Sequence, residues 1–224
     1  MPSHSLNILT KLVPPVPLAM ARRAETWTPD QPVVSPTRAA SVILLRERND
    51  GLETYLLHRH ARMAFAASTV VFPGGKVDPI DEEPGQDPLR ACAVRETEEE
   101  TGVALQPGDL KGWAHWITPQ VEPRRYDTWF FVARLPEGQD AQDLSGETDR
   151  AGWEHPSAAV ETAEGGEIAL MPPTLSILVE LAEAETLAGV LRLAEGRIVA
   201  PVLPVLVRQR SGWAFRYPRP DDHD

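Results

Sequence analysis

A single helical segment with three glutamates on one face is the feature that most constrains this chain. Residues 88–101 are predicted to form a helix, because Asp87 suits the N-cap and Gly102 suits the position that ends a helix. At about 100° per residue, glutamates three and four positions apart project from the same side of such a helix. These glutamates are Glu96, Glu99 and Glu100. The fold must therefore place a positively charged group near this acidic face to offset the repulsion among its carboxylates.

A divalent cation is a natural partner for the acidic face. Like charges at these spacings destabilise an isolated helix by about a few tenths of a kcal/mol per pair, and the helix dipole near its C-terminus adds to this cost. Mg²⁺ or Mn²⁺ accepts carboxylate oxygens and keeps waters that substrate phosphates can replace. Upstream, the Gly74-Gly75 turn exposes backbone groups that can approach phosphates, and Arg95 can pair with a carboxylate. Without these neighbours, a solvated acidic helix face would be an equal alternative.

The remaining segments predict an α+β fold. Strands are expected at residues 39–45, 54–58, 70–72, 103–106, 111–117, 126–134, 198–207 and 213–217. Further helices are expected at 156–162 and 174–187, and residues 136–149 read as a polar, acidic loop. Strands, one helix, strands and then helices follow one another, which fits an α+β or layered α/β/α arrangement rather than regular βαβ repetition.

Composition excludes several functional classes. Lys and Arg number 22 against 33 Asp and Glu, so the net charge is −11, and the clustered cations that a nucleic-acid polymer requires are not expected. A single cysteine, Cys92, excludes an internal disulfide and any zinc site with several cysteines. No apolar run reaches the roughly 18–20 residues that span a bilayer. We therefore expect a cytoplasmic protein with no membrane partner.

The chain divides into a leader and one domain. Residues 1–36 are rich in proline and are expected to form a partly irregular leader. Residues 37–224 are expected to form a single domain with a C-terminal helical and strand extension. Ala19-Met20-Ala21 has the form of a signal-peptide cleavage site, but the prolines in the short apolar stretch before it argue against that interpretation.

The acidic helix and the glycine turn together resemble the box of the Nudix hydrolase family. That box reads G-x5-E-x7-R-E-U-x-E-E-x-G-U, where U is an aliphatic residue. The matching positions are Gly75, Arg95, Glu96, Glu99, Glu100, Gly102 and Val103. The preceding Phe72-Pro73-Gly74 also matches the usual lead-in to the box. An arginine, glutamates and a glycine at these spacings would arise by chance about once in a thousand such chains or less, so the signal is specific.

The chain departs from the family box in three ways. Gly75 lies 20 positions before Arg95, six more than in the pattern. The acidic residue eight positions before Arg95 is Asp87 instead of a glutamate, and Thr97 replaces an aliphatic residue. The insertion lengthens the loop ahead of the helix and leaves the spacing of the glutamates intact. Metal binding is therefore little affected, whereas a pair between Arg95 and Asp87 becomes less secure.

The resemblance implies a Nudix-type α/β/α sandwich with a mixed central sheet, and an enzyme. The implied reaction is hydrolysis of a diphosphate joined to a nucleoside or a related group, assisted by Mg²⁺ or Mn²⁺. The implied catalytic residues are Arg95, Glu96, Glu99, Glu100 and Glu147. The implied metal ligands are Glu96, Glu99, Glu100 and Gly75. Glu147 is the candidate for the glutamate outside the box that often acts as base or further ligand in this family, and a solvated loop glutamate is the alternative.

Several stretches are similar to the peroxisomal coenzyme A diphosphatase branch of the family and its bacterial relatives. They cover residues 55–64, 70–78, 90–97, 113–119 and 125–131. This resemblance implies cleavage of coenzyme A (CoA) or acyl-CoA to 3′,5′-ADP and a phosphopantetheine. The partner would be a small, CoA-like nucleoside diphosphate, held by Gly74, Gly75, Arg59 and Arg62. The two arginines cluster with His58 and His60, as a CoA 3′-phosphate would require, and plain surface cations are the alternative. A homodimer is common in the family and is expected on that basis alone.

Three alternatives remain open. The substrate can be another nucleoside diphosphate derivative, such as ADP-ribose, NADH or a dNTP. The chain can be a catalytically silent Nudix-fold binding module, although a pure binder has no need for a cluster of like charges. It can also be a structural interaction protein, for which the Pro-rich leader is the motivation.

Overall fold

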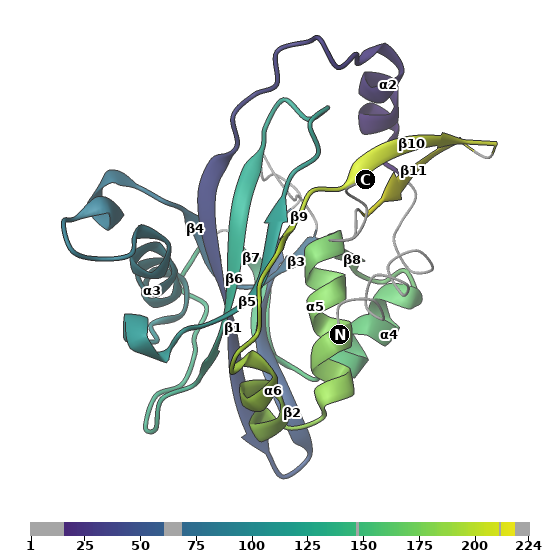
Figure 1. Cartoon of the computed structure of the whole chain (residues 1–224). Coiled ribbons are helices and arrows are strands. Elements are labelled where there is room, and N and C mark those ends of the chain that lie inside the picture. Colours follow the sequence, from purple (N-terminus) through teal and green to yellow (C-terminus); the bar gives the residue numbers. More distant parts are fainter. Residues whose placement is uncertain (1–15, 61–68, 147, 211, 218–224) are drawn as a thin grey trace.

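The sheet is built around two parallel strands at its centre. The structure is a computed structural model, and it describes residues 16–60, 69–146, 148–210 and 212–217. Strands β1 (Thr37–Arg48) and β6 (Tyr126–Arg134) pair in parallel along their length. Residues 42–45 of β1 are completely buried, because helices cover both faces of the sheet at this strand (Figure 1).

The order of the strands gives a mixed sheet. It runs β8-β3-β2-β1-β6-β5-β9, with β4 also paired to β1 and β7 also paired to β2. The other strands of this sheet are β2 (Gly51–Arg59), β3 (Thr69–Val71), β4 (Gly74–Lys76), β5 (Lys111–Ile117), β7 (Thr148–Glu154), β8 (Ala169–Leu170) and β9 (Pro201–Val202). Strands β10 (Val205–Gln209) and β11 (Gly212–Arg216) form a separate hairpin.

Helices cover the two faces of the sheet in separate layers. They are α3 (Pro88–Thr101) on one face, and α4 (Pro156–Glu164), α5 (Pro172–Ala184) and α6 (Leu187–Ala194) on the other (Figure 1). One buried cluster includes Cys92 of α3, and the other includes Leu178 of α5. The α/β/α sandwich with a mixed sheet is therefore confirmed. None of the helices in the described residues has the length and apolar character needed to cross a bilayer.

Small and hydroxyl residues allow α3 to pack closely on the sheet. The helix begins and ends where the sequence predicts, with the Asp87 side chain accepting a helix N–H and Gly102 at a φ of 73°. Thr97 and Thr101 are completely buried, and each hydroxyl donates a hydrogen bond to the carbonyl one turn earlier, at 2.7 and 2.6 Å. Thr97 therefore replaces an aliphatic residue without leaving a buried polar atom unsatisfied.

Helix α2 (Leu18–Thr26) lies in the Pro-rich leader, which the sequence predicts to be partly irregular. Pro17 takes the N-cap position, and the helix contains no proline. Ala24 is buried, and the helix lies beside the β10–β11 hairpin (Figure 1). The division between leader and domain at residue 37, where β1 begins, stays a prediction.

The helix predicted over residues 174–187 covers most of α5 but continues past its end to the first residue of α6. Helix α5 stops at Ala184, and Glu185 has a φ of 60°, which ends the helical path. The Thr186 side chain then accepts a hydrogen bond from the amide of Gly189 and so caps α6. The apolar spacing continues across this break, which explains why the sequence pattern does not reveal it.

Three strand predictions need correction. Strand β7 pairs antiparallel with β2, but its polar, half-exposed residues give no apolar alternation by which to predict it. Residues 103–106 form no strand, because Val103 and Leu105 are buried by packing without pairing in the sheet. The strand predicted at 198–207 is divided into β9 and β10 at Pro204, which has no N–H to donate.

Leu44 tests how much the central strand contributes to stability. Its side chain is completely buried, so Leu44→Ala is expected to lower the free energy of unfolding by about 2–5 kcal/mol, as urea denaturation would measure. Ile198 is 93% exposed and provides the control, because Ile198→Ala should change the same quantity by less than about 0.5 kcal/mol. Equal effects of the two substitutions would contradict this placement of the core.

Candidate active site

A cavity of about 610 Å³ brings the glutamates of α3 and the glycines of β4 together. The residues from the family box and its lead-in that line it include Gly74, Gly75, Glu96, Glu99 and Glu100. The same cavity continues past Trp116 and Phe130 of the sheet to Met171 before α5. One hollow therefore joins an acidic end to an apolar end.

The two glycines allow backbone and carboxylates to approach closely. Strand β4 pairs antiparallel with β1, and the amide of Gly74 donates a hydrogen bond of 2.8 Å to Oε2 of Glu100. A Cβ atom on Gly75 would lie 2.2 Å from Oε1 of Glu96, and one on Gly74 would lie 2.4 Å from the carbonyl oxygen of Ala40. Any side chain at these positions would have to displace a glutamate or the central strand.

Arg95 ties the acidic face to the loop ahead of the helix. Its Nε and Nη2 atoms donate to the two carboxylate oxygens of Asp81 at 2.9 and 2.8 Å. Its Nη1 donates to Glu96 at 2.9 Å and to Glu99 at 3.1 Å, and Nη2 also reaches the carbonyl of Lys76 at 3.2 Å. Arg95 is therefore a positioning residue that holds two of the three glutamates.

Arg95 does not pair with Asp87, a contact that the sequence already made less secure, and Asp81 takes that place. Asp87 instead accepts the amide of Leu89 at 3.0 Å as the N-cap of α3. Asp81 lies on the 3₁₀ turn η1 (Pro79–Glu82) and is 2% exposed. It is six positions after Gly75, which is where the box places its first acidic residue when counted forward. Counting forward from the glycine would have found Asp81, because the insertion lies between Asp81 and the helix.

The charges of the site shift the pKa values of its carboxyls in opposite directions. Burial raises the pKa of Glu96, and the charges of Glu99 and Asp78 add to the rise, while Arg95 opposes it. Burial alone would also raise the pKa of Asp81, but hydrogen bonds from Arg95 and from the backbone of Asp78 outweigh it and lower that pKa. The hydrogen bond with Asp81 in turn raises the pKa of Arg95, so its positive charge is permanent.

The donor chemistry of the acidic end fits a hard divalent cation. Glu96, Glu99 and Glu100 bring carboxylate oxygens to one cavity, and the Glu99 side chain is 58% exposed. Within the described part of the chain, no three His, Cys, Asp or Glu side chains converge as a ready-made ligand set. The reason is that Arg95 holds Glu96 and Glu99 while the amide of Gly74 holds Glu100. A cation there would compete with these contacts for the carboxylates.

The polar loop after β6 is docked on the end of α3. The amide of Gln142 donates to the carbonyl of Thr101 at 2.9 Å, and that of Leu144 donates to the carbonyl of Glu100 at 3.0 Å. Leu144 and Ser145 line the cavity as a result. The loop leads to Glu147, which lies outside the described residues, so its role stays a prediction.

Among the predicted substrate-binding cations in the described residues, Arg59 lines the cavity, but His58 and His60 do not. Arg59, at the end of β2, lines the cavity, whereas Arg62 lies outside the described residues. His58 contacts Glu154 at 2.7 Å, and His60 contacts Asp149, so each has a carboxylate partner within the fold.

Other residues near the box serve the structure. Arg125 is 7% exposed and donates to backbone carbonyls, including that of Val34 at 2.7 Å. The Cys92 thiol is completely buried and directed at the carbonyl of Gly75, and burial raises its pKa to about 12. A thiol with so high a pKa is a poor nucleophile, which agrees with a structural role.

The apolar end includes residues that the sequence does not suggest as site residues. Met20 of α2 and Phe215 of β11 line the cavity, although both come from segments predicted as a leader and an extension. Nothing in the local pattern of either segment points to a site, because the contact is made only when distant parts of the chain meet.

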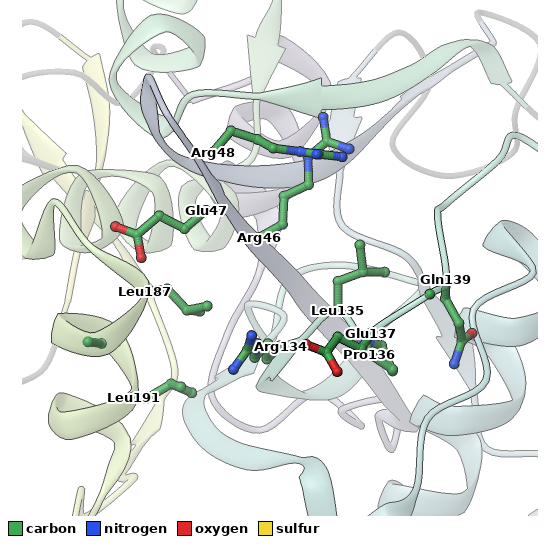
Figure 2. Close-up of a pocket in the computed structure, with 12 residues that line it drawn as sticks. Arg46, Glu47, Arg48, Arg134, Leu135, Pro136, Glu137, Gln139, Leu187 and Leu191 are labelled. Atoms are coloured by element: carbon green, nitrogen blue, oxygen red, sulfur yellow. The ribbon is translucent and has the colours of Figure 1, made fainter.

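A second hollow, of about 430 Å³, lies away from the family box. It is lined by the end of β1, by the segment after β6 and by α6, with Arg48 and Arg134 among its residues (Figure 2). Arg46 also lines it, but its guanidinium is bound to Glu53 at 2.6 Å and lies over the ring of Trp153. No residue of the box lines this hollow, so the acidic cavity is the candidate site.

Asp81 provides a test of the corrected ion pair. Asp81→Ala removes the buried partner of Arg95 and is expected to lower the free energy of unfolding by about 3 kcal/mol at neutral pH, whereas Asp87→Ala removes a cap and should cost about 1 kcal/mol. Folding lowers the pKa of Asp81 below its ordinary 3.8, so its ionised form stabilises the fold above that pH and loses this effect as pH falls through the lowered pKa. Urea denaturation from pH 7 to pH 3 should therefore show the difference between wild type and Asp81→Ala shrinking below about pH 4. A larger effect of Asp87→Ala would contradict the assignment.

Comparison with known proteins agrees with this geometry. Putative nudix hydrolase 7 of Caenorhabditis elegans is 29% identical in an alignment of 189 residues that covers 68% of this chain and 63% of the relative. Acyl-coenzyme A diphosphatase NUDT19 of Homo sapiens is 29% identical in an alignment of 114 residues that covers 49% of this chain and 30% of the relative. The chain thus spans less than two thirds of the length of either relative.

The fold agrees with solved structures as well. A NUDIX hydrolase from Alicyclobacillus acidocaldarius superposes with a TM-score of 0.64 at 22% identity, over 72% of this chain and 96% of the other. The NUDIX domain of Shewanella oneidensis NrtR superposes with a TM-score of 0.51 at 17% identity, over 73% of this chain and 96% of the other. A model of the NUDIX domain family matches residues 35–172. Because this match covers more than half of the chain and contains the whole acidic end of the cavity, the protein belongs to the Nudix domain family.

Proposed function

We propose that this protein is a divalent-metal-dependent hydrolase that cleaves the diphosphate linkage of CoA or acyl-CoA to 3′,5′-ADP and a phosphopantetheine. The observation that carries the proposal is the single cavity that joins the box carboxylates to a long apolar wall. The carboxylates can hold the metal ion that cleavage of a diphosphate requires. The apolar wall suits a pantetheine or an acyl chain. The printed name of the human relative, an acyl-coenzyme A diphosphatase, supports the same substrate class.

Glu96, Glu99, Glu100 and the carbonyl of Gly75 are the residues that would hold Mg²⁺ or Mn²⁺. When bound, such a cation supplies charge neutralisation for the diphosphate and lowers the pKa of a coordinated water. The guanidinium of Arg95 stays bound to Asp81 through two hydrogen bonds. It can therefore remain in place while the glutamates bind the metal ion.

The other residues of the site bind the substrate and move a proton. Arg59 lines the cavity and provides a guanidinium for a phosphate group. Glu147 is proposed to accept the proton of the attacking water, and its neighbour Ser145 lines the cavity. The oxygen of that water forms a bond to one phosphorus atom, and the bond from this phosphorus to the bridging oxygen breaks. The electron pair stays on the bridging oxygen, which leaves as part of the second phosphate.

The expected partner is therefore a small CoA-like nucleoside diphosphate. The cytoplasmic location, the homodimer and the choice between Mg²⁺ and Mn²⁺ remain predictions. Composition favours the first, and the family resemblance favours the other two.

A substrate panel tests the reaction. The purified protein is incubated with millimolar Mg²⁺ or Mn²⁺ and with CoA, ADP-ribose, NADH or dNTPs, and the products are identified by mass spectrometry. CoA should yield 3′,5′-ADP faster than the other compounds are cleaved, and a chelator should abolish the reaction. Faster cleavage of ADP-ribose or a dNTP would contradict the CoA assignment. No cleavage with either metal would favour a silent binding module.

Glu100 and Glu98 form a matched pair for testing the site. Glu100→Gln removes one anionic ligand but keeps an oxygen for the Gly74 amide, so it should lower kcat at least about 100-fold with an unchanged free energy of unfolding. Glu98 lies on the same helix, is exposed and does not line the cavity, so Glu98→Gln should retain wild-type kcat. Near-wild-type activity of Glu100→Gln would contradict the proposed metal site.

A further inference from the structure

Part of the apolar end of the cavity is formed by segments of the chain that lie outside the family match. Its outer wall is formed by Met20 of α2, Pro204 and Phe215, and Met171 before α5 continues it. We call this wall the apolar arm. The family model matches residues 35–172, so three of these four residues lie outside the matched range. Residues that line the cavity of the box glutamates from outside this range are placed to affect substrate preference.

Helix α2 is fixed to the domain by ion pairs on two sides. Arg23 is bound to Glu122, which itself lines the cavity. Glu25 is bound to Arg208 of β10 at 3.2 Å, which joins the helix to the hairpin. Figure 1 shows α2 and the hairpin side by side above the end of the sheet. Helix α2 and the β10–β11 hairpin therefore support each other beside the cavity.

Aromatic contacts fix the hairpin to the sheet. The rings of Phe215 and Tyr217 are stacked with centroids 6.3 Å apart, and the ring of Tyr217 meets that of Trp116 edge to face at 5.8 Å. Trp116 belongs to β5 and lines the same cavity. The arm is thus continuous with the sheet that carries the acidic end.

We propose that the apolar arm binds the acyl chain of acyl-CoA, so that α2 and the β10–β11 hairpin determine the chain-length preference of the enzyme. The proposal rests on the proposed CoA hydrolase function. The side chains of the arm are thioethers, a proline ring and a phenyl ring, which offer no hydrogen bonds to the polar edge of a nucleobase. Methionines adapt to apolar groups of variable shape, as a series of acyl chains requires. Glu122, the acidic residue next to the arm, is neutralised by Arg23.

The direct test compares CoA, acetyl-CoA and octanoyl-CoA. Affinity is measured by calorimetry with Ca²⁺ as the cation, and kcat/KM is measured with Mg²⁺ or Mn²⁺. Each methylene that the arm buries is expected to tighten binding up to about fourfold, so octanoyl-CoA should bind at least about tenfold more tightly than CoA. Equal affinity for CoA and octanoyl-CoA would overturn the proposal.

Substitutions in the apolar arm test whether it causes the preference for octanoyl-CoA. Met20→Glu places a carboxylate in the arm and should reduce the preference for octanoyl-CoA over CoA at least about tenfold. Phe215→Ala, on the opposite element, should reduce the same preference. Met20→Leu keeps an apolar side chain of similar volume and should retain it. Leu18 is 68% exposed on the same helix and does not line the cavity, so Leu18→Glu is the matched control and should behave as wild type.

The possible outcomes separate this proposal from the proposed function. Cleavage of CoA without any preference for acyl chains would overturn the role of the arm and leave the hydrolase intact. Tighter binding of octanoyl-CoA that depends on Met20, without cleavage of any CoA compound, would support the arm and contradict the hydrolase. An equal loss of CoA and octanoyl-CoA affinity in Met20→Glu would show that the arm holds the adenosine part instead, and would overturn the proposal.

Discussion

The guanidinium of Arg95 is the contact on which the architecture of the site depends. It donates two hydrogen bonds to the buried Asp81 and further ones to Glu96, Glu99 and the carbonyl of Lys76. One permanent cation thus joins the 3₁₀ turn η1, strand β4 and the acidic face of α3. The same charge offsets part of the repulsion among glutamates that would destabilise the isolated helix. The fold can therefore keep an acidic face in a cavity.

Close approach between backbone and carboxylates completes this arrangement. Because Gly74 and Gly75 carry no side chains, strand β4 lies against the glutamates and pairs with the central strand at once. On the other side of the helix, Thr97 and Thr101 bond to the helix backbone and leave a narrow face for the sheet. The position of α3 is thus fixed from both sides, and the glutamates have little freedom to move away from the cavity.

In the proposed function, the two ends of the cavity divide chemistry and binding between them. Its acidic end comes from α3 and β4 on one side of the sheet, while its apolar end comes from the sheet itself, the start of α5 and the elements at the two ends of the described chain. Contacts remote from the reacting phosphorus can then supply binding energy that positions the diphosphate. Segments outside the family match can thus affect which substrate is bound while the box stays unchanged.

The sequence by itself determined the local features of this protein. The bounds of α3 and the common face of Glu96, Glu99 and Glu100 follow from residue spacing and cap residues, which act over a few positions. The turn predicted at Gly74-Gly75 is wrong, because both glycines lie in strand β4 and pair with β1. Only the tertiary structure decided that Asp81 instead of Asp87 meets Arg95, and that Met20 and Phe215 share a cavity with the box. The physical reason is that these contacts join residues far apart in the chain, where the path of an inserted loop and the docking of α2 decide which side chains meet, and no local periodicity records that choice.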